Sequence, residues 1–228
     1  MTVLVTGLLG ATATWMFRDS DDAGSGAPEN EPPLTWVVKQ EHLGCPFFVV
    51  EGSYEDVPKL PSNPEKLATW ASQVGARSAN TVTVRLTLQG TSDAVVVLDS
   101  LTAAIDGTPR VEGGVYSVEL CPVPTVAPIR GFEAELNPRD STIPLSPRRV
   151  ADFPYRISLA EPEVFRIVVD PGSCTCDWTL QLAWTSGGKS GTVTIDDRGE
   201  PFRSASKQGR VQYMYESSAK SWVENPFA

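Results

Sequence analysis

The chain has 228 residues, of which 41% are hydrophobic and 21% charged, and its formal net charge is −9. This length suffices for one large domain or two small ones, each with a buried core. The acidic balance argues against a nucleic-acid-binding protein, because the sequence shows no basic patch that would neutralise phosphates. The single histidine, His42, limits histidine-based chemistry to one catalytic site.

Residues 1–17 form a hydrophobic N-terminal segment that carries no charge before Arg18. A membrane-spanning helix needs about 20 apolar residues, so the segment is slightly short. It also lacks the positively charged start of a signal peptide. We favour a membrane anchor that continues upstream of Met1. A cleaved signal peptide and a buried element of the domain are the two alternatives.

Residues 18–33 predict an acidic, disordered linker, because they hold little that could form a core. Its five acids give segment 1–31 a formal charge of −4: Asp19, Asp21, Asp22, Glu29 and Glu31. Acidic residues, unlike lysine and arginine, are not retained on the cytoplasmic side of a membrane. We therefore expect a cell-membrane protein whose domain is extracytoplasmic, or a secreted protein if the N-terminus is a cleaved signal.

Residues 34–228 predict a single domain of short strands. In segment 81–88, Val82, Val84, Leu86 and Leu88 alternate with polar residues, which is typical of a half-buried strand. Segments 90–93 and 186–189 are predicted hairpin turns. The predicted strands are 35–39, 47–50, 81–88, 94–101, 115–120, 131–136, 155–159, 164–169, 178–184, 192–195, 211–215 and 222–223.

One helix is predicted over residues 63–75. Asn63 is placed to cap it, apolar residues follow at helical spacing from Leu67, and Gly75 supplies the stop. The proline-rich segment 137–150 predicts a long crossover loop. Together these elements predict an all-β fold: an antiparallel β-sandwich, Ig-like or a partly open barrel, with one short inserted helix.

Four cysteines, an even number, predict disulfides in an exported domain: Cys45, Cys121, Cys174 and Cys176. Cys174 and Cys176 would close a very small ring if they paired with each other on an extended backbone. We therefore expect Cys45 and Cys121 each to pair with one member of this couple. A zinc site and free thiols are the alternatives.

No motif predicts a catalytic residue, a cofactor or a metal ion. His42 lies near Cys45, but no glycine-framed nucleophile accompanies them, and a loop histidine is the simpler interpretation. Residues 195–200 cluster three acids without the spacing of a calcium loop, which favours an ordinary Asx turn. Paired carboxylates for glycoside hydrolysis remain open, because the sequence selects no pair.

The aromatic residues divide into core and surface candidates. Trp178 and Trp184 share one face of a strand with leucines, which predicts core packing. Trp36 and Phe48 are further core candidates, and Trp70 lies on the apolar face of the helix. Exposed aromatics suited to sugar stacking or to a protein hot spot form the candidate binding surface: Tyr213, Tyr215 and Trp222.

The C-terminal stretch contains the segments DFPYRIS (152–158), EPEVF (161–165), CTCDWTLQLAW (174–184) and SGGKSGTVTIDDRGEPFR (186–203). In these segments the chain resembles a family of uncharacterised actinobacterial proteins. The resemblance spans residues 34–223 and is densest after Phe153. In that family a similar half follows an N-terminal hydrophobic segment. The resemblance implies a compartment and a kinship, and it makes an upstream cytoplasmic extension plausible, but it supplies no catalytic residue.

These observations predict a non-catalytic domain, tethered to the membrane, that binds or senses a protein or cell-envelope component and no nucleic acid. The alternative is a carboxylate-dependent cell-envelope hydrolase. A binder is expected to present an aromatic or apolar patch, whereas an enzyme is expected to present a deep cleft with convergent acids.

Overall fold

The computed structural model describes residues 31–41, 45–61, 63–117, 130–216 and 218–226. Residues Pro32–Ala228 form one compact unit. Within the described ranges, no helix is both long enough and apolar enough to cross a membrane. The hydrophobic segment 1–17, almost all of the linker 18–33, His42 and Cys121 lie outside the described residues.

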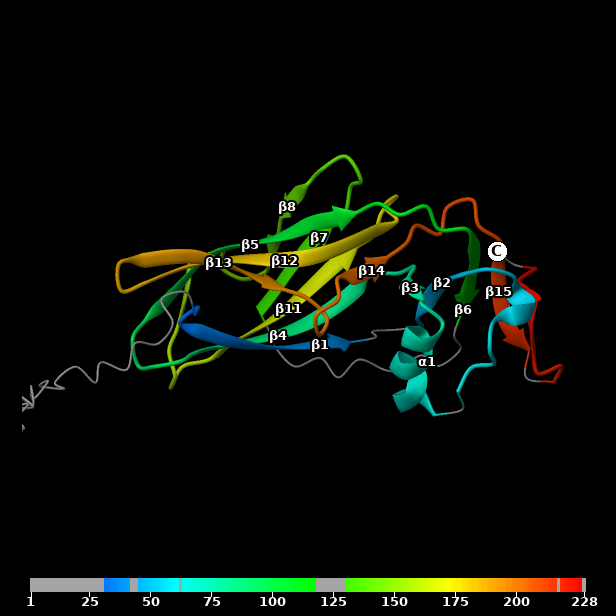
Figure 1. Cartoon of the computed structure of the whole chain (residues 1–228), viewed down its shortest axis with the longest axis horizontal. Coiled ribbons are helices and arrows are strands. Elements are labelled where there is room, and N and C mark those ends of the chain that lie inside the picture. The colour runs from blue at the N-terminus through cyan, green and yellow to red at the C-terminus, as the bar shows by residue number, and fades with distance from the viewer. Residues whose placement is uncertain (1–30, 42–44, 62, 118–129, 217, 227–228) are drawn as a thin grey trace, which may run out of the picture. The chain divides into compact units, whose positions relative to one another are not determined.

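Two β-sheets face each other and confirm the all-β sandwich (Figure 1). Sheet A has five strands, in the order β1 (Leu34–Glu41), β4 (Val82–Gly90), β11 (Glu163–Asp170), β7 (Arg130–Glu135) and β9 (Ser146–Arg148). Sheet B has eleven strands. Nine of them lie in the order β10 (Tyr155–Ile157), β5 (Val96–Gly107), β12 (Cys176–Ser186), β14 (Phe202–Ser204), β3 (Arg77–Ser78), β2 (Phe47–Glu51), β6 (Gly113–Ser117), β15 (Gln212–Glu216) and β16 (Ser221–Glu224). The other two lie beside this order: β13 (Lys189–Ile195) pairs with β12, and β8 (Thr142–Pro144) pairs with β5.

Both sheets are mixed rather than purely antiparallel. Most neighbouring strands are antiparallel, but β7 runs parallel to β11, β14 to β3, and β15 to β6. The sheets stay separate, and neither closes on itself. The two three-residue strands β8 and β9 lie within the segment expected to be a crossover loop, and they join different sheets, so this segment does pass between the layers.

The main core fills the space between the two sheets. The alternation predicted for β4 is present, because Val84, Leu86 and Leu88 are fully buried while Arg85 and Thr87 lie on the other face. Trp178, Leu180 and Leu182 of β12 are buried opposite them, as predicted. Trp184 is only partly buried, but it packs against the main core from the end of the same strand.

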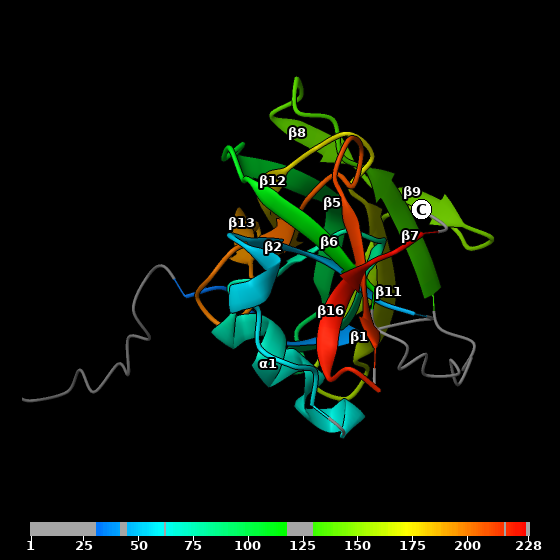
Figure 2. The same cartoon turned by 90° about the vertical axis from the view of Figure 1, so that its right-hand side faces the viewer.

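A smaller core lies at one end of the sandwich, where sheet B continues past β14 (Figures 1 and 2). The predicted helix is present as a 3-10 turn, η2 (Pro64–Lys66), followed by α1 (Leu67–Gln73). Asn63 Oδ1 accepts a hydrogen bond from the Glu65 amide at 2.9 Å, so the expected cap forms. The smaller core consists of Phe48, Val50, Val57, Leu67, Trp70, Tyr116 and Trp222.

The connection at residues 90–93 is not the hairpin that the sequence predicted. β4 belongs to sheet A and β5 to sheet B, so this segment carries the chain from one layer to the other. A Cβ atom on Gly90 would lie 2.9 Å from the Ser158 backbone, which explains the glycine. The prediction failed because the sequence of a tight turn does not reveal the relation of the two strands that it joins. They can be hydrogen-bonded neighbours in one sheet, or they can lie in two sheets that pack against each other.

The predicted long-range disulfides to Cys174 and Cys176 are also wrong, since these two cysteines are bonded to each other. The two Cα atoms are 5.4 Å apart, within the range that a disulfide requires. Cys174 lies at the end of a turn, where its amide donates to the Pro171 carbonyl at 2.8 Å, and Cys176 is the first residue of β12. Cys45 is disulfide-bonded as well.

Candidate functional site

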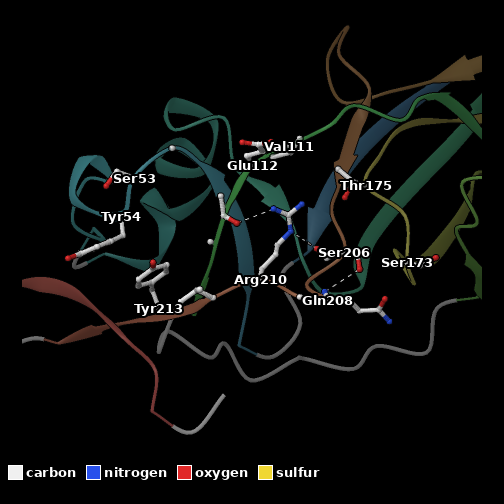
Figure 3. Close-up of a pocket in the computed structure, with 15 residues that line it drawn as sticks. Ser53, Tyr54, Val111, Glu112, Ser173, Thr175, Ser206, Gln208, Arg210 and Tyr213 are labelled. Atoms are coloured by element: carbon white, nitrogen blue, oxygen red, sulfur yellow. Dashed lines mark hydrogen bonds between the residues drawn. The ribbon is translucent and has the colours of Figure 1, made fainter.

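A cleft of about 700 Å³ lies where the smaller core meets the sandwich (Figure 3). Four separate segments contribute to it. They are residues 52–54 after β2, residues 111–114 at the start of β6, residues 173–175 before β12, and the segment 206–213 that leads from β14 into β15. The site therefore combines loops held in place by strands, the usual location of binding residues.

Arg210 occupies the middle of this cleft (Figure 3). Its Nε donates to the Ser206 carbonyl at 2.9 Å and its Nη1 to the Gly113 carbonyl at 3.0 Å. The side chain is half-buried, and among the described residues no carboxylate lies within ion-pair distance of it. A fixed positive charge with unused N–H donors therefore lies in the cleft.

Three tyrosine rings are stacked at one end of the cleft. The Tyr213 ring lies between Tyr54, at a centroid distance of 5.1 Å, and Tyr116, at 5.2 Å. Tyr54 is 41% exposed and covers the outer side of the stack, whereas Tyr116 belongs to the smaller core. The stack joins the exposed wall of the cleft to the buried interior.

Two glycines at the start of β6 make this arrangement possible. A Cβ atom on Gly113 would lie 2.0 Å from the Val50 carbonyl oxygen, so only glycine lets β6 pair with β2 this closely. A Cβ atom on Gly114 would lie 2.4 Å from Tyr213 Cε2. The Tyr213 ring thus rests directly on the backbone of β6.

The rest of the cleft wall combines two valines, Val111 and Val211, with polar groups. Hydroxyl and amide side chains from three of its four segments line it: Ser53, Ser173, Thr175, Ser206 and Gln208. Glu112 is the single acid among the described lining residues, and its side chain is 77% exposed and contacts Arg110 at 3.3 Å. The cleft is therefore equipped to donate hydrogen bonds to an anionic, hydroxyl-bearing ligand rather than to bring two carboxylates together.

The predicted binding aromatics are only partly brought to this site. Tyr213 lines the cleft, and Tyr215 is half-buried and packs edge-on against Trp222 at 5.3 Å. Trp222 is only 4% exposed, so its assignment to an exposed surface is wrong. Its Nε1 donates to the Val57 carbonyl at 3.2 Å. The pairing of β16 with β15 places the indole in the smaller core, together with Leu67 and Trp70 of the helix.

Sequence reasoning did not identify Tyr54 or Arg210. No motif surrounds either residue, and they lie 156 positions apart in the chain. The pair Gly113-Gly114 at the start of a predicted strand was the one available signal, since glycine inside a strand often marks a close approach of another group.

The other sequence candidates behave as ordinary structural features. The Gly199 amide donates to Asp196 Oδ1 at 2.8 Å, which confirms the Asx turn. No cluster of three or more potential metal ligands occurs in the described ranges. A second hollow of about 620 Å³ includes Glu135, Arg139 and Asp140 and shares Ser173 with the cleft. Comparison with protein-family models, with curated proteins and with solved structures found no match to this chain.

Proposed function

We propose that this chain is a non-catalytic binding or sensing domain that recognises a cell-envelope component or a protein partner through the cleft around Arg210. The observation that carries the proposal is the half-buried Arg210 guanidinium, anchored by two backbone carbonyls and facing the cleft without a carboxylate partner among the described residues. A cation anchored in this way needs no rearrangement to accept an anion.

The side chains that line the cleft restrict the chemical class of the ligand. A carboxylate is the group that a guanidinium binds with two parallel hydrogen bonds. The surrounding hydroxyls of Ser53, Thr175 and Ser206 suit a ligand that carries hydroxyl groups, and the exposed ring of Tyr54 offers an apolar face at the rim. We infer a chain end or small group that combines a carboxylate with hydroxyls, as an acidic sugar does.

The test is a pair of NMR titrations with glucuronate and with glucose, which differ by one carboxylate. We expect saturable shifts of the Arg210 side-chain and Gly113 amide signals with glucuronate and none with glucose. Arg210→Gln should weaken binding at least about tenfold, as expected for loss of a charged hydrogen bond. Arg210→Lys should retain part of it.

The matched control is Arg156→Gln, which removes an exposed arginine from β10, outside the cleft. It should leave the titration unchanged. Circular dichroism of each variant shows whether it is folded. Equal shifts with the two sugars, or unchanged binding by a folded Arg210→Gln protein, would contradict the proposal. Release of nitrophenol from nitrophenyl glucuronide, lost in variants of cleft residues, would instead favour the hydrolase alternative.

We further propose that segment 1–17 tethers the domain to the cell membrane on its outer side and that the chain is kin to the actinobacterial family that it resembles. The support is the uncharged segment followed by the acidic linker. Protease added to intact cells should digest the domain, and an alkaline carbonate wash should leave the full chain in the membrane fraction. Digestion only after permeabilisation would contradict the outward orientation.

A further inference from the structure

The outer face of sheet A carries a row of positive charges that the sequence does not reveal. In register across the strands, Lys39 of β1 lies beside Arg85 of β4, and Arg85 lies beside Arg166 of β11. Arg166 is followed by Gly131 of β7 and then by Arg148 of β9. We call Lys39, Arg85, Arg166 and Arg148 the cationic row. It crosses all five strands of the sheet shown in Figure 1.

The cationic row lies on the solvent side. Arg85 alternates along β4 with Val84 and Leu86, which are fully buried in the main core. Exposure differs along the row: Lys39 is exposed, and the side chains of Arg148, Arg85 and Arg166 are 53%, 37% and 14% exposed. The exposed charge therefore lies mainly at the two ends of the row. Neighbouring strands are about 4.8 Å apart, so four such intervals give the row a length of roughly 19 Å.

Two carboxylates only partly neutralise these four cations. Glu41 forms ion pairs with Arg85 Nε at 2.8 Å and with Arg166 Nε at 3.2 Å, and Glu133 contacts Arg148 Nε at 2.9 Å. Lys39 has no ion pair with a described residue. The row therefore keeps a positive excess on a chain of net charge −9. Glu41 offsets the repulsion between Arg85 and Arg166, but the directly opposed pair Lys39 and Arg85 keeps a like-charge contact that is unfavourable for folding.

The surroundings of the row differ on its two sides. The next register position in one direction holds the acids Glu41 and Glu133. The next position in the other direction holds Val37, Thr87 and Val164, which carry no charge. Val37 is 66% exposed although it is a large apolar residue. We call Val37, Thr87 and Val164 the neutral row. A negatively charged ligand is thus attracted to the cationic and neutral rows and repelled by Glu41 and Glu133 on the other side.

We propose that the cationic and neutral rows bind a linear polysaccharide that carries carboxylates, laid across the strands of sheet A. Glu41 and Glu133 already engage the three arginines of the row, so the charge that remains for a ligand comes from Lys39 and from the N–H donors of the arginines that these acids leave unused. Sugar rings offer apolar C–H faces that match the neutral row. A sheet is twisted, so a flexible chain follows the row better than a flat membrane surface does. The proposal does not depend on the Arg210 cleft.

The test compares polygalacturonate with its fully methyl-esterified form, which has the same backbone without the charges. Biolayer interferometry on the full chain should show binding to polygalacturonate that weakens as salt rises, and no binding to the ester. Lys39→Gln with Arg148→Gln should weaken binding about three- to tenfold, because each exposed ion pair contributes modestly. These positions avoid the Glu41 network, so the variant should fold.

The matched control is Lys189→Gln with Arg156→Gln, which removes the same charge from exposed positions of sheet B and should change binding little. Val37→Asp tests the neutral row, because it places a negative charge there without removing a cation, and it should weaken binding as well. All of these variants are compared in an Arg210→Gln background, so that a polymer end bound in the cleft does not contribute and this proposal and the cleft proposal fail separately.

Three outcomes would overturn the proposal. The first is equal binding to the esterified polymer. The second is an equal loss in the sheet B control, which would mean that net charge alone is responsible. The third is binding to phosphatidylglycerol vesicles but not to polygalacturonate, lost in the Lys39 and Arg148 variant, which would identify a membrane as the occupant.

Discussion

The hydroxyl group of Tyr116 is fully buried and has no hydrogen-bond partner among the described residues. A buried polar group without a partner lowers stability by about 1–3 kcal/mol. We expect Tyr116→Phe, which keeps the ring stacked on Tyr213 but removes this hydroxyl, to raise the free energy of unfolding by up to about 1 kcal/mol. Urea denaturation at neutral pH measures this change, and a marked loss of stability would show that the hydroxyl has a partner.

The same group makes stability depend on pH. Burial, and then the charge of the nearby Tyr213, raises the pKa of Tyr116 from 10.0 to about 12. The unfolded chain therefore loses this proton at a lower pH than the folded protein does. The contribution of Tyr116 to stability is complete below pH 10 and is lost as the pH rises through about 12.

Urea denaturation of the natural chain and of Tyr116→Phe between pH 9 and pH 12 checks this sign. Both proteins contain the other titrating groups, so only the difference between their unfolding free energies reports on Tyr116. This difference should favour the phenylalanine variant increasingly as the pH rises. A constant difference would mean that the pKa of Tyr116 is the same in the folded and unfolded states.

Gly114 determines whether the tyrosine stack can form. An alanine Cβ would lie 2.4 Å from the Tyr213 ring, so Gly114→Ala should displace this ring and lower stability by about 1–3 kcal/mol, as overpacking does. Gly107→Ala is the matched control, because its Cβ would have no neighbour closer than 4.0 Å. Thermal denaturation of both variants, with NMR signals of Tyr54 and Tyr213, measures the effect. Equal changes in the two variants would contradict it.

Among the elements, β12 begins at a local disulfide rather than at a long-range one. A bridge between Cys174 and Cys176 closes a three-residue loop, which constrains the unfolded chain by only about 1–2 kcal/mol, against about 4–5 kcal/mol for the long loops first expected. The bridge therefore shapes the start of β12 more than it stabilises the whole fold.

Non-reducing peptide mapping tests the pairing. We expect one peptide that contains both Cys174 and Cys176 and that changes mass by two hydrogens on reduction. A peptide in which either residue is joined to Cys45 or Cys121 would restore the long-range pattern. Alkylation under denaturing conditions before digestion controls for exchange between thiols and disulfides.

For the molecule as a whole, the junction between the main core and the smaller core contains a third buried cluster, formed by Val49, Ala79, Val115 and Ala205. Sheet B is continuous at this junction through one paired position, Ser204 of β14 with Ser78 of β3. Arg77 contacts Asp177 at 2.6 Å across the same junction, and Trp178 Nε1 donates to Ser204 Oγ at 2.9 Å. The cleft lies at this junction, so its shape depends on both cores.

We expect hydrogen exchange to distinguish the two cores. Amides of β5 and β12, which pair over nine positions at the centre of sheet B, should exchange only through global unfolding. Amides of β15 and β16, which pair over four positions at its end, should exchange faster. Asp177→Asn should increase that difference by weakening the junction, whereas Asp99→Asn, on the exposed face of β5, should not. Equal protection of both regions would indicate a single cooperative unit.

Features that depend on neighbouring residues could be predicted from the amino-acid sequence. The alternation in β4, the cap and apolar face of the helix, and the hairpin turn between β12 and β13 are all local. Gly187 and Gly188 adopt the positive φ angles, 56° and 76°, that this two-residue turn requires. Because each such signal lies within a few residues, the all-β class and most strands could be predicted.

Which strands lie side by side could not be predicted in this way and became known from the fold. The passage of residues 90–93 between the sheets, the burial of Trp222, the cleft around Arg210 and the cationic row of sheet A all depend on that pairing. Pairing joins residues far apart in the chain, as Tyr116 with Tyr213, and it is governed by the shared burial of many side chains. No single segment contains that information, so the candidate sites became visible only when the strands were placed in register.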